Sequence, residues 1–201
     1  MEELPKRRKV TVKELQQKTD AGELLVAVTA YDALTARLVD GVGVDVILVG
    51  DSLGMTVMGY ENTVPVTIND CLHHAAAVTR ARPSALVVGD MPFLTYQVSP
   101  EQALVNAGRF LQEGRTDAVK LEGGRVIAPT IRRLVQAGIP VLGHIGVLPQ
   151  SVLAEGGYRV QGRTPEEAAA LEEDARAVQD AGAFALVLEC LPMSLSARIT
   201  D

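Results

Sequence analysis

The sequence is poor in the residues that mark several large classes of protein. It has 201 residues with no tryptophan, an aromatic content of 3%, two cysteines and three histidines. The isolated Cys71 and Cys190 argue against a disulfide framework or a Cys/His zinc site, and predict two packed thiols in a reducing, cytosolic protein. No apolar run approaches the roughly 20 residues that span a bilayer, and the charged N-terminus lacks the apolar core of a signal peptide.

Positive charge is also scarce. The chain carries 19 Lys and Arg against 25 Asp and Glu, a net charge of −6, which offers no footprint for nucleic acid or an anionic membrane. One basic cluster, Lys6-Arg7-Arg8-Lys9, has no interleaved aromatic residues and is interpreted as a solvated face. With 47% hydrophobic residues, a single globular domain over residues 1–201 is expected, its residues 1–23 forming a leader and short helix.

Six short apolar runs recur along the chain, each ending in a polar or small residue and followed by a longer amphipathic stretch. Runs without polar alternation are typical of strands buried on both faces of a parallel sheet. The predicted strands are Leu24–Ala30, Val44–Gly50, Ala85–Gly89, Ala118–Leu121, Pro140–Gly143 and Phe184–Leu188.

Helices are predicted between these runs, where apolar residues recur at spacings of three and four. Thr11 and Glu14 form a capping-box pattern in the leader, Thr164 precedes a proline at the first helical position, and Gly182 stands where a helix should close. The predicted helices are Asn69–Arg82, Pro100–Glu113, Pro129–Ala137 and Pro165–Asp180.

The alternation of strand and helix predicts right-handed βαβ units and a parallel sheet, either open or closed into a barrel. A nucleotide-binding open sheet would carry G-x-G-x-x-G or a Walker A loop after a strand, and neither is present, since Gly41-Val42-Gly43 precedes its strand. Chemically active side chains follow the strands instead. A (β/α) barrel is therefore the favoured fold.

Charged or polar side chains stand at or just beyond the predicted strand ends. Taken singly, each acid is as readily a helix cap or a turn former. In a barrel, however, the C-terminal ends of the strands converge on one face, so these residues are expected to line one pocket. They are Asp51, Ser52, Asp90, Lys120, Glu122, His144 and Glu189.

Four carboxylates in one pocket would repel one another at neutral pH unless a cation offset their charge. Oxygen ligands without a Cys/His cluster favour Mg²⁺ or Mn²⁺ over zinc. His73 and His74 lie on a predicted helix and are interpreted as structural. His144 stands at a strand end, where a catalytic role and a hydrogen-bonding role behind the ligands are both open.

These residues belong to segments that resemble the ketopantoate hydroxymethyltransferase (3-methyl-2-oxobutanoate hydroxymethyltransferase) family. Each segment alone is a weak signal, but together they follow the family's order along the whole chain. They are Val28-Thr29-Ala30-Tyr31-Asp32, Gly50-Asp51-Ser52-Leu53-Gly54-Met55, Pro65-Val66-Thr67, Gly89-Asp90-Met91-Pro92-Phe93, Lys120-Leu121-Glu122-Gly123-Gly124, Gly143-His144-Ile145-Gly146, Pro149-Gln150, Gly156-Gly157-Tyr158 and Leu188-Glu189-Cys190.

The resemblance implies a (β/α)8 TIM barrel of the phosphoenolpyruvate/pyruvate-type superfamily. It implies transfer of a hydroxymethyl group from 5,10-methylenetetrahydrofolate to 3-methyl-2-oxobutanoate, giving 2-dehydropantoate for pantothenate and coenzyme A synthesis. Asp51 and Asp90 would ligate Mg²⁺ and help bind the substrate, with Glu122 close to the ion. Ser52 and Lys120 would hold the keto acid, and Glu189 would accept the proton.

The chemistry of these residue types agrees with the implied roles. A keto acid can chelate Mg²⁺, which would stabilise the enolate formed when the C3 proton leaves. Burial at the end of an apolar strand would make Glu189 a stronger base. Lys120 offers a positive charge to the substrate carboxylate, and a salt bridge from Lys120 to Glu122 is compatible with that role.

The family barrel needs eight βα units in about 250 residues, and only about six can be counted here. We therefore expect about the last two units to be missing from this chain, leaving two unpaired sheet edges. The resemblance further implies a homo-oligomer, a decamer, that acts on a small keto acid and a folate, with no nucleic-acid or membrane partner.

Two other readings remain open. A Mg²⁺-dependent lyase or mutase acting on a keto acid would share the barrel and the acid cluster, but such enzymes rely on a Cys-Gly-His loop that this sequence lacks. In the second reading the acids are helix caps, and the chain is a structural or interaction domain without catalytic activity.

Overall fold

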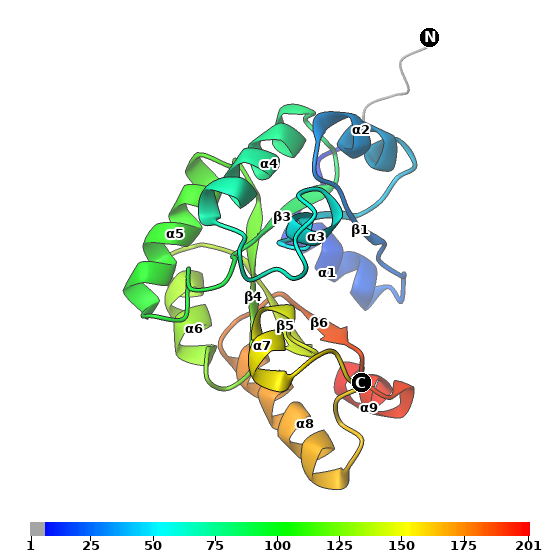
Figure 1. The fold of residues 1–201 in the computed structure, drawn as a ribbon. Coiled ribbons are helices and arrows are strands. Elements are labelled where there is room, and N and C mark those ends of the chain that lie inside the picture. The colour runs from blue at the N-terminus through cyan, green and yellow to red at the C-terminus, as the bar shows by residue number, and fades with distance from the viewer. Residues whose placement is uncertain (1–6) are drawn as a thin grey trace.

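The fold is a single parallel sheet of six strands with helices packed on its outer face (Figure 1). The structure is a computed structural model and describes residues 7–201, so Lys6 of the basic cluster and residues 1–6 of the expected leader lie outside the described residues. The strands pair in sequence order. They are β1 (Ala27–Thr29), β2 (Val46–Val49), β3 (Leu86–Asp90), β4 (Ala118–Glu122), β5 (Val141–Gly146) and β6 (Ala185–Glu189).

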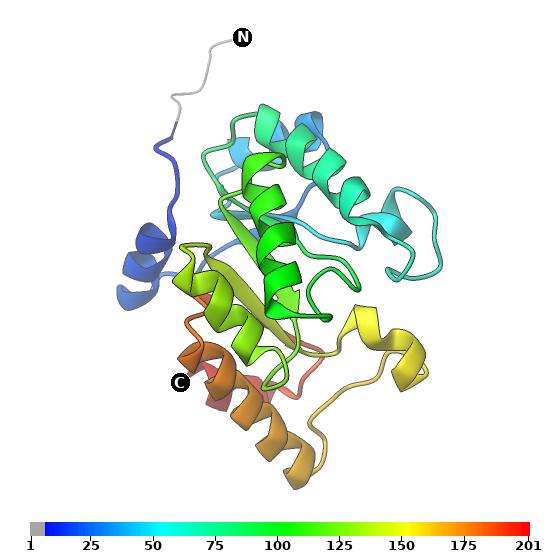
Figure 2. The ribbon, with the colours of Figure 1, turned by 90° about the vertical axis from the view of Figure 1, so that its left-hand side faces the viewer.

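Except for α1 before β1 and α9 after β6, the helices lie between consecutive strands. Figure 2 shows α4, α5, α6 and α8 side by side across the outer face of the sheet. Short helices cluster at the ends of the strands, with α1 at one end and α7 at the other (Figure 2). The helices are α1 (Val12–Asp20), α2 (Ala33–Gly41), α3 (Leu53–Thr56), α4 (Ile68–Arg80), α5 (Pro100–Gln112), α6 (Ala128–Gln136), α7 (Val152–Glu155), α8 (Pro165–Asp180) and α9 (Met193–Thr200), with a 3-10 turn η1 (Pro149–Ser151) before α7.

The predicted barrel class is confirmed as a half-barrel of six parallel strands. Successive side chains of each strand alternate between two buried layers. The outer layer, which includes Ile47, Val87 and Leu121, packs against the helices, whereas Val46 and Leu86 belong to the inner layer. Parallel strands covered on both faces explain why the sequence shows apolar runs without polar alternation.

Helix α1 covers the N-terminal ends of the strands. Its start is the predicted capping box, in which Thr11 and Glu14 each bond the other's backbone amide. Leu15 packs into the inner layer, and Lys18 forms an ion pair with the buried Asp45 at 2.7 Å. Helix α1 thus packs against the inner layer at this end of the half-barrel, and the candidate polar residues lie at the opposite end.

The two edge strands are less buried than the four between them. Every residue of β3 and β4 is buried, whereas β1 is mostly exposed and no residue of β6 is fully buried. Within residues 7–201 each edge strand pairs with one neighbour, as the sequence predicted. None of the described helices combines the length and apolar character needed to cross a membrane.

Candidate active site

The strand register brings the predicted polar residues together at the C-terminal end of the half-barrel. Asp90 of β3 is paired with Lys120 of β4, and Glu122 is paired with His144 of β5. Because Lys120 and Glu122 are two residues apart on one strand, both side chains point to the inner face. All seven predicted residues line one cavity of about 430 Å³: Asp51, Ser52, Asp90, Lys120, Glu122, His144 and Glu189, the first two lying just after β2.

A buried cluster of charge occupies the floor of this cavity. Lys120 Nζ lies 2.7 Å from Asp90 Oδ1 and 3.5 Å from Glu122 Oε1. The backbone amide of Asp51 donates to Asp90 Oδ2 at 3.1 Å. All four residues are at most 5% exposed. Three carboxylates therefore share a single buried ammonium group.

Burial and the neighbouring charges shift the pKa values of these groups. Burial, together with the charge of Asp90, raises the pKa of Asp51 to about 8. Burial also raises the pKa of Asp90, although the charge of Lys120 opposes the shift. Burial alone would lower the pKa of Lys120, but the surrounding carboxylates raise it, so the amine stays protonated. The floor of the cavity thus holds three carboxyl groups for one ammonium group, and the raised pKa values of Asp51 and Asp90 reflect the cost of ionising those two buried carboxyls.

His144 lies between two carboxylates. Its Nδ1 is 3.4 Å from Glu122 Oε1, and its Nε2 is 3.1 Å from Glu189 Oε2. Burial by itself would lower the pKa of His144, but the two carboxylates outweigh it and the pKa is raised. Burial alone would likewise raise the pKa of Glu122, and the contacts with His144 and Lys120 lower it. The two carboxylates therefore favour the protonated form of this imidazole, which lines the cavity.

Two expectations about this row of residues were wrong. His144 does not stand at a strand end, because β5 continues to Gly146. Glu189 was expected to be buried, which would strengthen it as a base. Its side chain is instead 40% exposed, because β6 is an edge strand. The carboxylate of Glu189 is thus the most accessible of the four to a substrate in the cavity.

A buried hydrogen-bond network behind the cavity was not predicted. Gln150 Nε2 donates to Asp51 Oδ2 and to the carbonyl of Met91, both at 2.9 Å, and its Oε1 accepts from Tyr96 Oη at 2.8 Å. The Gln150 backbone amide donates to Glu122 Oε2 at 3.2 Å. The side chain and the backbone amide of one residue thus fix two carboxylates, Asp51 just after β2 and Glu122 at the end of β4.

No periodic pattern could have revealed this network, because Gln150 lies in a three-residue 3-10 turn and Tyr96 in a loop. Pro149-Gln150 belongs to a segment that resembles the family, and Tyr96 lies outside all of those segments. Tyr31 also belongs to such a segment, and its hydroxyl lies 2.7 Å from Ser52 Oγ and fixes that side chain at the rim. In a protein with 3% aromatic residues, a tyrosine placed just after a predicted strand was the available signal.

The remaining expectations concern residues outside the cavity. Cys71 is buried as expected, but Cys190 is exposed, so only one of the two thiols is packed. His73 and His74 lie on α4, and His74 Nδ1 is 2.7 Å from the Tyr31 carbonyl oxygen, which fits a structural role.

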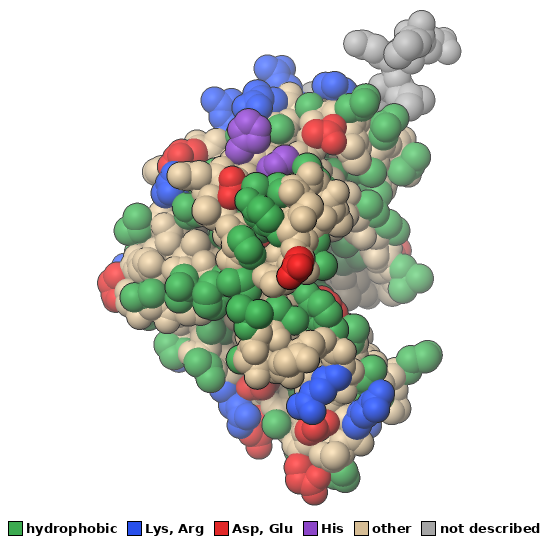
Figure 3. All heavy atoms as spheres, in the orientation of Figure 1, with side chains coloured by type: hydrophobic (Ala, Val, Ile, Leu, Met, Phe, Trp, Pro, Cys, Tyr) green, Lys and Arg blue, Asp and Glu red, His purple; other side chains and the backbone are tan. Residues whose placement is uncertain are grey.

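Arg7, Arg8 and Lys9, the described members of the basic cluster, are exposed but not merely solvated. Arg7 donates to the carbonyls of Gly43 and Val44, and Lys9 donates to the carbonyl of Ala85. On the face drawn in Figure 3, basic side chains appear at the top and bottom, with acidic ones beside them. Charge of both signs is interspersed over this face.

The fold and the position of the site define a (β/α)-barrel enzyme with its polar centre at the C-terminal ends of the strands. Residues 9–201 match the family model described as ketopantoate hydroxymethyltransferase. Two relatives are called 3-methyl-2-oxobutanoate hydroxymethyltransferase. The one from Moorella thermoacetica is 54% identical over 98% of this chain, and the one from Chloroflexus aurantiacus is 58% identical over 96%. The chain belongs to the ketopantoate hydroxymethyltransferase family.

The chain spans 73% of the length of the first relative and 68% of the second. Among solved structures, 2,3-dimethylmalate lyase, described as a PEP mutase/isocitrate lyase superfamily member, has a TM-score of 0.66 at 22% identity, over 94% of this chain and 65% of that one. Phosphonopyruvate hydrolase in complex with oxalate and Mg²⁺ has a TM-score of 0.69 at 14% identity, over 96% and 68%. At these identities the likeness concerns the fold.

Proposed function

We propose that the chain transfers a hydroxymethyl group from 5,10-methylenetetrahydrofolate to 3-methyl-2-oxobutanoate, giving 2-dehydropantoate in pantothenate synthesis. The observation that carries this proposal is the cavity at the strand ends, where carboxylates, a buried ammonium group and a partly exposed carboxylate face one space of about 430 Å³. Family membership supplies the reaction, and the cavity supplies groups suited to each of its steps.

The residues present fit a divalent cation such as Mg²⁺. Asp51 and Asp90 are buried side by side, and the raised pKa of Asp51 marks a place where a further positive charge would be stabilised. The described residues hold no group of three or more His, Cys, Asp or Glu arranged to bind a metal by themselves. Mg²⁺ is commonly held by one or two carboxylates, with water and substrate completing the octahedron.

In this proposal Asp51 and Asp90 hold the ion and Glu122 lies close to it. The bound ion would supply the positive charge that offsets the negative charge developing on the keto acid. Gln150 keeps the Asp51 carboxylate turned toward Asp90 through its 2.9 Å hydrogen bond.

Ser52 and Lys120 are proposed to hold the keto acid. Lys120 is buried and cationic, and its ammonium group already balances carboxylates at the cavity floor. The Ser52 hydroxyl is fixed by Tyr31 at the rim and can bond the substrate carboxylate. Together they would orient C3 of the substrate toward Glu189.

Glu189 is proposed to accept the C3 proton. Its carboxylate reaches into the cavity from β6, and His144 at 3.1 Å holds it from behind. The electron pair left at C3 then forms a bond to the methylene carbon of the folate, and one of that carbon's two bonds to folate nitrogens breaks. Water displaces the second nitrogen and supplies the hydroxyl oxygen of the product. The two folate nitrogens take up the proton held by Glu189 and one proton from the water. His144 positions the base and does not itself touch the reacting carbon.

The test is whether product formation depends on the folate donor. Purified protein is incubated with 3-methyl-2-oxobutanoate and Mg²⁺, with and without 5,10-methylenetetrahydrofolate, and 2-dehydropantoate is quantified by mass spectrometry. We expect product only when the donor is present. Product formed equally without the donor, or cleavage of the keto acid in its place, would contradict the transferase assignment.

We also propose that the enzyme works as a homo-oligomer in the cytoplasm. The resemblance to the family supports the assembly, and the two unpaired thiols among the described residues suit a reducing compartment. Light scattering coupled to size-exclusion chromatography would measure the mass of the particle, and a monomeric mass would refute the assembly.

A further inference from the structure

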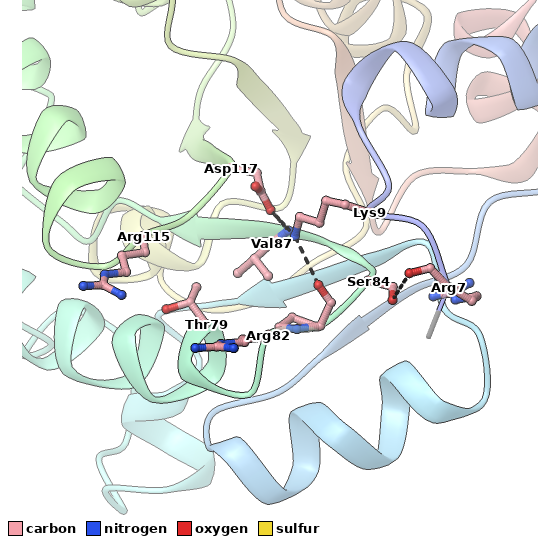
Figure 4. Close-up of a pocket in the computed structure, with 9 residues that line it drawn as sticks. Arg7, Lys9, Thr79, Arg82, Ser84, Val87, Arg115 and Asp117 are labelled. Carbon is pink, nitrogen blue, oxygen red and sulfur yellow. Dashed lines mark hydrogen bonds and ion pairs between the residues drawn. The ribbon is translucent and has the colours of Figure 1, made fainter. Parts of the chain in front are cut away.

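A second cavity lies at the opposite end of the strands from the candidate active site. It has a volume of about 300 Å³ and is reached from the N-terminal ends of β3 and β4. In a (β/α) barrel this end serves stability and carries no catalytic residues. Its lining residues are Arg7, Lys9, Thr79, Arg82, Pro83, Ser84, Val87, Arg115 and Asp117 (Figure 4).

The lining of this cavity is strongly cationic in an acidic protein. Four of its side chains are Arg or Lys and one is Asp, although the chain as a whole carries a net charge of −6. The one acid is already neutralised, because Asp117 accepts from the Val87 amide and lies 2.7 Å from Lys9 Nζ. The positive charge of the cavity is therefore in excess.

The excess charge resides on Arg82 and Arg115. Arg7 and Lys9 already donate hydrogen bonds to backbone carbonyls just before the strands. Arg7 donates to those of Gly43 and Val44, and Lys9 donates to that of Ala85. Within residues 7–201, neither the Arg82 nor the Arg115 guanidinium has a hydrogen-bond or ion-pair partner. Figure 4 shows both on the same side of the cavity as Thr79. Guanidinium groups without a partner are suited to bind phosphate oxygens.

The backbone at these two arginines is unfavourable for any residue with a side chain. Arg82 and Arg115 have φ of 54° and 56°, in the left-handed region, and each lies in the turn from a helix to the next strand. The corresponding turns after α2, α6 and α8 place glycine in that region, at Gly43, Gly138 and Gly182. Glycine would adopt the turn without strain, so arginine is kept there at a conformational cost.

We propose that this cavity is a binding site for a small phosphate-bearing anion, held chiefly by Arg82 and Arg115 and separate from the candidate active site. The cavity volume lies at the lower end of the range for ligand pockets, which suits a compact anion and not an extended cofactor. The hydroxyl groups of Thr79 and Ser84 also line the cavity, but each already donates to a backbone carbonyl, that of Gly114 and that of Arg7, so the two guanidinium groups are the donors left for the anion.

Pyrophosphate is the probe for this site, and binding is measured by isothermal titration calorimetry at low ionic strength. The protein is first treated with EDTA, so that the probe cannot bind a metal ion at the active site. We expect binding to wild type that weakens as salt is added. The Arg82→Gly, Arg115→Gly double variant is expected to bind roughly tenfold or more weakly, while its melting temperature is unchanged or raised.

A control removes the same charge elsewhere. Arg159→Gln with Arg163→Gln deletes two exposed arginines between α7 and α8, which are not part of the cavity lining, and its affinity is expected to stay within about twofold of wild type. If the glycine variant does not fold, Arg82→Asn with Arg115→Asn replaces it, because Asn tolerates the left-handed region. No binding to wild type, or equal binding by the cavity variant and wild type, would overturn the proposal.

Discussion

At the scale of single residues, the position of Asp51 depends on Gln150. The amide of Gln150 bonds Asp51, Met91 and Tyr96 at once, in a region closed to water. No other described side chain donates a hydrogen bond to the Asp51 carboxylate. Gln150 is thus a positioning residue that shapes the cavity without lining it.

We predict that Gln150→Leu lowers the free energy of unfolding by about 1–3 kcal/mol, because it leaves buried polar groups without partners. Urea denaturation measures the change. The control is Gln136→Leu on the exposed face of α6, expected to stay within about 0.5 kcal/mol of wild type. Equal stability of the two variants would mean that the network contributes nothing.

The raised pKa of Asp51 predicts how the free energy of unfolding depends on pH. In the metal-free protein this pKa is raised from 3.8 to about 8 by burial and by Asp90. Between these values the folded protein binds more protons than the unfolded chain, so the free energy of unfolding falls as pH rises from about 4 to about 8. Each pKa unit of difference corresponds to about 1.4 kcal/mol.

We therefore expect the free energy of unfolding of EDTA-treated wild type to fall between about pH 4 and pH 8. The same treatment of Asp51→Asn should give a smaller fall. Urea denaturation at several pH values measures both slopes. Asp180→Asn, which removes an exposed carboxyl on α8, serves as the control and should keep the wild-type slope. A slope in Asp51→Asn equal to that of wild type would show that Asp51 does not titrate in this range.

The acids of the site could be predicted from the sequence because their position follows from two regularities. Side chains alternate along a strand, and parallel strands end on one face of a barrel. Asp90, Glu122 and Glu189 are the last residues of their strands, so both rules apply to them. Gln150 lies in the short 3-10 turn η1 and Tyr96 in a loop, and the paths of such segments depend on packing that no local pattern encodes.

At the scale of elements, the ends of β5 and β6 form the most constrained junction near the site. The Val147 amide donates to the Glu189 carbonyl at 2.9 Å, just beyond Gly146. Gly146 has φ of 98°, and a Cβ built there would collide with the same carbonyl oxygen. Glycine at this position lets the two strands approach and sets the place of Glu189.

We predict that Gly146→Ala destabilises the protein by about 2 kcal/mol or more and displaces Glu189. Gly108→Ala is the matched control, because Gly108 lies inside α5 with open space around its Cα. That change should stabilise the protein by about 0.5–1 kcal/mol. Chemical denaturation should show that the free energy of unfolding falls in Gly146→Ala and rises in Gly108→Ala. Changes of the same sign would contradict this explanation of the junction.

Elements with strong end signals were predicted most accurately. The bounds of α8 agree with the prediction at both ends, because Thr164 caps it, Pro165 occupies its first position and Gly182 follows its end. Helices α2, α3 and α7 were not predicted. Helices α3 and α7 have four residues each, which is too short for a periodic pattern to show. Helix α2 has one buried residue, Ala36, so its apolar face is weakly defined.

At the scale of the whole molecule, the two ends of the half-barrel carry opposite charge. Excess carboxylate gathers at the C-terminal ends of the strands, and excess guanidinium lies at their N-terminal ends. A cation should therefore stabilise the folded protein from one end only, through Asp51 and Asp90. Binding to the folded state alone raises stability by about 2.7 kcal/mol at 100 times the dissociation constant.

We predict that Mg²⁺ raises the melting temperature of wild type and leaves that of an Asp51→Ala, Asp90→Ala double variant unchanged. Isothermal titration with Mg²⁺ should show binding to wild type that is lost in the double variant. The cavity variant Arg82→Gly, Arg115→Gly is the control and should bind Mg²⁺ as wild type does. Loss of Mg²⁺ binding in the control, or its retention in the double variant, would contradict the placement of the metal.

The measurement that tests the central claim most directly is exchange of the C3 proton of 3-methyl-2-oxobutanoate in deuterated water, followed by NMR without folate. The account predicts exchange by wild type that requires Mg²⁺, and a loss of about 10²-fold or more in Glu189→Gln with keto acid binding retained. Glu166→Gln, an exposed carboxyl of α8, should exchange at the wild-type rate. Full exchange by Glu189→Gln would contradict the account.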